Sequence, residues 1–190
     1  MAFVDEASEA LAGSWLLAKR DTSGYALFND TAAGFWRSFA AILLIAPFYF
    51  MFIEMEAGLI SPPDGGGEVD MTRFHVAGYT ALVVHWFAYP FVLFMLARPL
   101  GFASRYILYV VAYNWSAVLV VIVMSVPVYC YRIGILDAAT AGFANVLLVL
   151  PALYYRWFIA RTALAINGAL ASSVVALDVT LSFVVNAMFR

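Results

Sequence analysis

The fold is decided by the stretch at residues 106–128, which reads YILYVVAYNWSAVLVVIVMSVPV. It contains no charged side chain, and it is longer than the ~20 apolar residues that a helix needs to cross a bilayer. The whole chain has the same character, because 65% of its residues are hydrophobic and only 12% are charged. Soluble domains carry about 25% charged residues. The sequence therefore predicts a membrane protein.

Four more apolar runs are long enough to cross a bilayer, at residues 36–57, 74–96, 135–155 and 163–188. The loop after the first run contains Pro62, Pro63 and three consecutive glycines, and irregular backbone of this kind does not face lipid. We therefore predict an all-α fold, a polytopic transmembrane bundle of five spans over residues 36–190. In a bacterium such a protein would lie in the inner membrane.

Residues 1–35 form the longest polar stretch and are expected to make a cytoplasmic or interfacial segment. Val4, Leu11, Trp15 and Ala18 recur at helical spacing, which predicts a short amphipathic helix. This helix could lie on the membrane surface or pack on the ends of the spans, and the sequence does not choose between the two. The first ten residues are acidic and lack an apolar core, so we do not expect a cleavable signal peptide.

The distribution of basic residues predicts the orientation. With five spans, seven of them fall on the N-terminal side of the membrane and three on the other. The seven are Lys19, Arg20, Arg37, Arg98, Arg105, Arg156 and Arg161; the three are Arg73, Arg132 and Arg190. Because basic loops stay in the cytoplasm, we expect the N-terminus inside, and the C-terminus and the acidic loop at residues 54–70 outside.

Four strongly polar residues lie near the midpoints of four spans: His85, Asn114, Asn145 and Asp178. A charged group there costs roughly 2.5–3.5 kcal/mol, so Asp178 needs a reason to be present. The four could form a proton or substrate site in which Asp178 and His85 titrate as a pair. They could equally be hydrogen-bonding groups that hold the helices in register. We favour the second interpretation, because the sequence shows no second acid or buried base beside Asp178.

Small residues form a row at the start of the last apolar run, which predicts close packing of another helix. They are Ala165, Gly168, Ala169, Ser172 and Ser173. The partner helix could belong to the same chain or to another subunit.

No cofactor or metal is predicted. The chain lacks the usual metal, nucleotide and dinucleotide motifs, has one cysteine, Cys130, and has no basic cluster for nucleic acid. Six polar residues near the outer end of the first span could bind a divalent cation, although a solvated loop explains them better; they are Glu54, Glu56, Asp64, Glu68, Asp70 and His75. The aromatic residues at positions 86–94 could hold a quinone or pigment, but packing explains them better.

These features do not predict an enzyme, because no catalytic motif is found. The first hypothesis is an accessory or scaffold subunit of a membrane complex, which contacts the bilayer and either other membrane subunits or copies of itself. The alternative is a small transporter or channel component with a polar site around Asp178 and His85.

Overall fold

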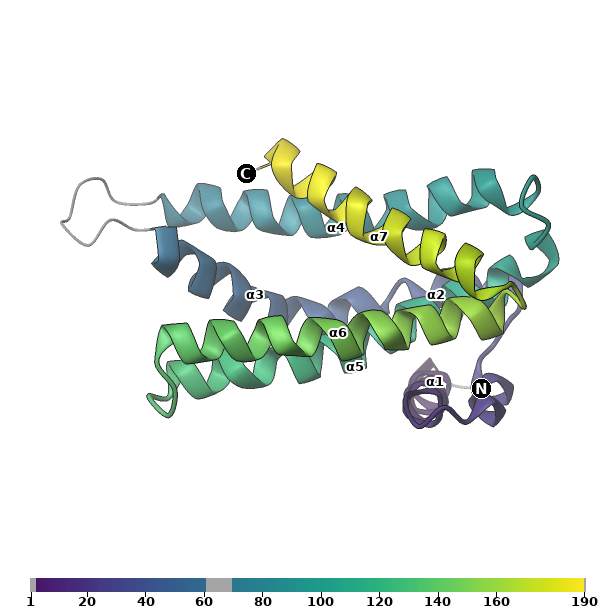
Figure 1. Cartoon of the computed structure of the whole chain (residues 1–190), viewed down its shortest axis with the longest axis horizontal. Coiled ribbons are helices and arrows are strands. Elements are labelled where there is room, and N and C mark those ends of the chain that lie inside the picture. Colours follow the sequence, from purple (N-terminus) through teal and green to yellow (C-terminus); the bar gives the residue numbers. More distant parts are fainter. Residues whose placement is uncertain (1–2, 61–69, 190) are drawn as a thin grey trace.

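The computed structural model describes residues 3–60 and 70–189, which form helices and no strand (Figure 1). The α-helices are α1 (Phe3–Ala18), α2 (Ala32–Ser38), α3 (Ala41–Ile60), α4 (Met71–Ala97), α5 (Tyr106–Arg132), α6 (Ala138–Ala163) and α7 (Gly168–Phe189). Two short 3-10 helices are also present, η1 (Thr22–Leu27) and η2 (Ala103–Arg105).

Five stretches are helical, long and apolar enough to cross a membrane, as the sequence predicts. They are Ala32–Ala57, Met71–Ala97, Ala103–Arg132, Ala138–Ala163 and Gly168–Phe189. The first joins α2 to α3 through a tight 3-10 turn at Phe39 and Ala40. This result supports a multi-pass membrane protein.

The fourth predicted span, which forms α6, differs from its predicted bounds. The sequence places the end of this span at residue 155, before two arginines, but α6 continues through both to Ala163. Arg156 is accommodated because its side chain turns inward onto Tyr113, and Arg161 lies over the ring of Trp157. The last helix accordingly begins later, at Gly168, after Ala165 adopts a left-handed backbone conformation with φ of 53°.

Helix α5 lies at the centre of the molecule and contacts α1, α2, α3 and α6. All its residues from Val110 to Val118 are buried. Helix α7 packs on α4 and α6, and Figure 1 shows α4 and α7 together on one side of the bundle. Large apolar side chains cover much of the outside, and Leu150 and Val146 are 71% and 66% exposed. Lipid tails accommodate such a surface, and water does not.

Helix α1 lies across the spans rather than along them, and Figure 1 shows it nearly end-on. It contacts the sides of α5 and α6 near one end of the bundle, whereas α7 ends towards the opposite end. The buried face of α1 consists of Glu6, Ala10, Gly13, Ser14 and Leu17. Of the predicted apolar face, Leu11 packs against the core, whereas Val4, Trp15 and Ala18 are exposed.

A close backbone approach and an ion pair are among the contacts that hold α1 in place. The backbones of Gly13 and Gly24 approach so closely that a Cβ atom on Gly24 would lie 2.5 Å from the Gly13 carbonyl oxygen. Neither position therefore has room for a larger residue. The carboxylate of Glu6, which is 3% exposed, accepts a 2.8 Å hydrogen bond from Nη1 of Arg37 in α2. This ion pair joins α1 to the start of the first span.

Candidate functional site

Asp178 lies at the middle of α7 and is held by side chains from two other helices. Its Oδ1 accepts a 2.7 Å hydrogen bond from the hydroxyl of Tyr113 in α5. The same oxygen lies 3.2 Å from Nε2 of His85 in α4. The side chains of Asp178 and His85 are 13% and 18% exposed. The carboxylate is therefore largely removed from solvent, and the Tyr113 hydroxyl and the His85 imidazole replace part of its contact with water.

Arg156 extends this arrangement to a fourth helix, α6. Its guanidinium carbon lies 3.9 Å from the centre of the Tyr113 ring, and Nη1 donates a 3.2 Å hydrogen bond to the Tyr113 carbonyl oxygen. It also interacts electrostatically with Asp178. We call Asp178, His85, Tyr113 and Arg156 the Asp178 network. In this network Tyr113 and His85 contact Oδ1 of Asp178, and the Arg156 guanidinium packs on Tyr113.

A pair of hydrogen-bonded tyrosines adjoins the Asp178 network. The hydroxyls of Tyr89 and Tyr109 lie 2.6 Å apart, and both residues are almost fully buried. The Tyr89 ring packs against Tyr113, with 4.7 Å between ring centres, and against His85, with 6.3 Å between ring centres. The side chains of His85 and Tyr89 on α4, and of Tyr109 and Tyr113 on α5, therefore form one polar and aromatic group next to Asp178. Groups of these types can relay protons when their hydrogen bonds connect.

The four residues predicted at one polar level are not brought together as a group. His85 and Asp178 are in contact, but Asn114 points the other way, and its Nδ2 donates a 2.9 Å hydrogen bond to the Ser38 hydroxyl. The reason is helical geometry, because Tyr113 and Asn114 are consecutive and lie about 100° apart around α5. Asn145 lies on α6, and its buried Oδ1 has no hydrogen-bond partner among the described residues.

Tyr113 and Arg156 are members of the Asp178 network that the sequence reasoning missed. Two spacings in the sequence indicate a polar face that includes Tyr113. His85 and Tyr89 are four residues apart, and so are Tyr109 and Tyr113, so each pair shares a helix face. Arg156 was missed because the predicted fourth span ended before it.

The row of small residues does not pack inside this chain as a continuous stripe. Ala165 precedes α7, and Gly168 contacts Trp157, whose Nε1 donates a 3.1 Å hydrogen bond to the Gly168 carbonyl oxygen. Ala169, Ser172 and Ser173 are exposed on α7, and Ser172 lines a hollow between α6 and α7. The face of α7 that packs on the bundle instead carries Ala171, Val174 and Val185.

One pair from the predicted acidic cluster forms at the other end of the bundle. Oε1 of Glu54 lies 2.7 Å from Nε2 of His75, whose ring stacks on Phe50. Asp64 and Glu68 lie outside the described residues. Within residues 3–60 and 70–189, no three metal-ligating side chains come together.

Comparisons with protein-family models, with curated proteins and with solved structures find no match for this chain. Its function is therefore inferred from its own residues. The Asp178 network is the candidate site, because it brings ionisable side chains from four helices into contact.

Proposed function

We propose that this protein is a small membrane transporter or channel component in which the Asp178 network moves or senses protons. The observation that supports this proposal is the position of Asp178, whose Oδ1 lies 2.7 Å from the Tyr113 hydroxyl and 3.2 Å from His85 Nε2. Ionisable residues inside spans are rare and usually mark ion pathways or proton relays. Histidine is the side chain best suited to exchange a proton near neutral pH.

The ionisable groups around Asp178 support this proposal over a purely structural role. His85 Nε2 lies 3.2 Å from Oδ1 of Asp178. Arg156 lies over the ring of Tyr113, whose hydroxyl donates a hydrogen bond to Asp178. When Asp178 binds a proton, its attraction to Arg156 is lost, and the balance of contacts among α4, α5, α6 and α7 changes. A proton can therefore be linked to helix rearrangement, as alternating access requires.

The proposed orientation places the N-terminus in the cytoplasm and the C-terminus outside, as the basic residues indicate. The turn between α4 and α5 then faces the cytoplasm, and the turn between α5 and α6 faces outside.

A second candidate is an accessory or scaffold subunit of a membrane complex. The observation that favours it is the exposed row of Ala169, Ser172 and Ser173 on α7. Small and hydroxyl side chains allow helices to approach closely inside a membrane. The two candidates are compatible if the protein carries protons within a larger assembly.

The test is proton movement into liposomes that contain the purified protein, followed with a trapped pH-sensitive dye under an imposed membrane potential. We expect proton entry above that of protein-free liposomes, and we expect Asp178→Asn to remove most of it. Asp137→Asn is the matched control, because Asp137 caps α6 outside the span and Asn caps a helix equally well.

Each result has a defined meaning. Proton entry that is equal in the wild-type protein and in Asp178→Asn would overturn the proposal. Loss of a co-purifying partner in Ser172→Leu, with proton entry unchanged, would support a role in assembly through the outer face of α7.

A further inference from the structure

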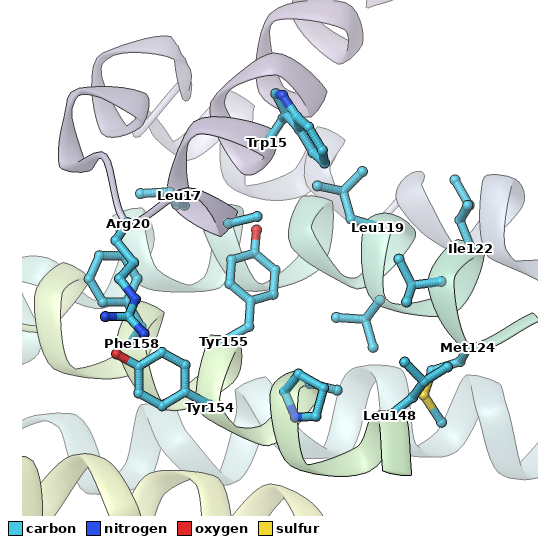
Figure 2. Close-up of a pocket in the computed structure, with 15 residues that line it drawn as sticks. Trp15, Leu17, Arg20, Leu119, Ile122, Met124, Leu148, Tyr154, Tyr155 and Phe158 are labelled. Carbon is cyan, nitrogen blue, oxygen red and sulfur yellow. The ribbon is translucent and has the colours of Figure 1, made fainter. Parts of the chain in front are cut away.

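An apolar groove lies beneath the C-terminal end of α1, between α5 and α6 (Figure 2). Its volume is about 420 Å³, and its walls include Leu119 and Met124 from α5 and Leu148 and Phe158 from α6. We call it the α1 groove. Arg20 also lines it, at the edge next to Tyr154. It is separate from the Asp178 network, so nothing in the proposed function accounts for it.

The α1 groove has the length of one lipid tail. Along α6 it extends from Phe158 to Leu148, and ten residues of α-helix measure about 15 Å. This is half the ~30 Å hydrocarbon core. One end lies under α1, where the Tyr155 hydroxyl donates a 2.6 Å hydrogen bond to the Ser14 carbonyl oxygen. The other end lies near the middle of the spans, so the α1 groove follows the path of an acyl chain through one leaflet.

Arg20 occupies an unusual backbone position at the edge of the α1 groove. Its φ is 66°, and the amides of Arg20 and Asp21 bond to the carbonyls of Leu17 and Leu16. This is a Schellman helix end, where the left-handed residue is normally glycine because a side chain strains that conformation. An arginine is nevertheless present, and its guanidinium lies 4.8 Å from the centre of the Tyr154 ring.

Two basic residues, Lys19 and Arg20, precede one acid, Asp21, so the net charge at this edge is positive. Among the described residues Arg20 forms no ion pair, and the exposed Lys19 precedes it, with its ammonium 5.0 Å from the Trp15 ring centre. Tryptophan and tyrosine are typical of the level of lipid headgroups, and basic residues at that level attract anionic lipids.

We propose that the α1 groove binds one acyl chain of an anionic phospholipid, whose phosphate is held by Arg20. The apolar walls suit the tail, the length suits one leaflet, and the unpaired guanidinium suits the phosphate. The lipid would also fill the space between α1 and the spans, so it would stabilise the docking of α1.

The test measures lipid binding to the purified full-length protein in detergent by native mass spectrometry. The probes are dioleoyl phosphatidylglycerol, dioleoyl phosphatidylcholine and sodium phosphate. We expect phosphatidylglycerol to bind tightest and Arg20→Gly to weaken it about fivefold, which is the effect of one basic residue near a membrane surface. Arg98→Gln, which removes a charge at the α4–α5 turn, should bind as the wild type does.

A second variant tests the tail. Ala152→Trp fills the α1 groove and leaves Arg20 unchanged, and we expect it to lose phosphatidylglycerol binding. Arg20→Gly keeps the proposal testable if Ala152→Trp does not fold, because glycine suits the left-handed position. Equal binding of the two lipids, binding of sodium phosphate in place of the lipid, or wild-type binding by Arg20→Gly would overturn the proposal.

Discussion

The Tyr113 hydroxyl donates a 2.7 Å hydrogen bond to Oδ1 of Asp178, which joins the most buried helix of the bundle to the last one. A hydrogen bond to a charged group contributes about 1.5–3 kcal/mol, and its loss leaves the carboxylate with fewer partners. This contact should therefore affect both the stability of the bundle and the behaviour of Asp178.

Replacement of Tyr113 by phenylalanine removes the hydroxyl and keeps the ring. We expect Tyr113→Phe to lower the free energy of unfolding in detergent by about 2 kcal/mol and to reduce proton entry into liposomes. Tyr129→Phe is the matched control, because Tyr129 lies on the same helix and is 56% exposed. If both variants unfold at the same temperature, the Tyr113–Asp178 contact has no energetic importance.

Arg156 and Asp178 should be energetically coupled. Removing one member of a buried charged network leaves the other uncompensated, at a cost of about 3 kcal/mol. We expect Arg156→Gln and Asp178→Asn each to destabilise the protein, and the double variant to lose less than the sum of the two. A double-mutant cycle of thermal unfolding measures this coupling. Strictly additive losses would show that the two residues act independently.

Tyr25 in η1 should make the packing of α1 and η1 on the spans sensitive to alkaline pH. Its hydroxyl lies 2.7 Å from Thr162 Oγ1 on α6, and burial raises the pKa of Tyr25 from 10.0 to about 12. The folded protein therefore keeps this proton longer than the unfolded chain does. Its contribution to stability is complete below pH 10 and is lost as the pH rises towards 12.

Stability measured from pH 9 to pH 12 checks this prediction. Tyr25→Phe should cost about 1 kcal/mol at neutral pH, because it removes a hydrogen bond. It should also lose less stability than the wild type does above pH 10. Parallel curves for the two proteins over the alkaline range would refute the assignment to Tyr25.

The proposed orientation can be tested in intact cells. In a Cys130→Ser background, a cysteine at Ile135 should react with an impermeant thiol reagent from outside, and a cysteine at Ser104 should react only after lysis. Ile135 is exposed in the turn between α5 and α6, and Ser104 is exposed in η2, so accessibility within the protein does not limit either reaction. The reverse pattern would place the N-terminus outside.

The five helices could be predicted because hydrophobicity is a local property of the sequence. Long uncharged runs such as residues 106–128 cannot easily be anything but spans. The helix ends are harder to predict, since Arg156 lies within α6 and its side chain packs on Tyr113 of α5. That contact depends on a helix far away in the sequence.

The composition of the Asp178 network could be predicted only in part, because depth along a span is visible in the sequence and rotation about its axis is not. The sequence allows Asp178 and His85 to pair as one of two interpretations, and the two side chains lie in contact. Asn114 lies at a similar depth but faces Ser38, and the adjacent Tyr113 faces Asp178. Rotation is set by packing of the whole bundle, which a single helix does not record.

The most direct measurement is the protonation state of Asp178 itself, recorded by infrared spectroscopy on protein in liposomes with isotope-labelled aspartate. The signal of Asp178 is identified by its absence in Asp178→Asn. The proposed role predicts that this signal switches between carboxylate and carboxylic acid when the pH on one side of the membrane is changed. An Asp178 signal that stays the same at every pH at which the protein remains folded would contradict a role in moving protons.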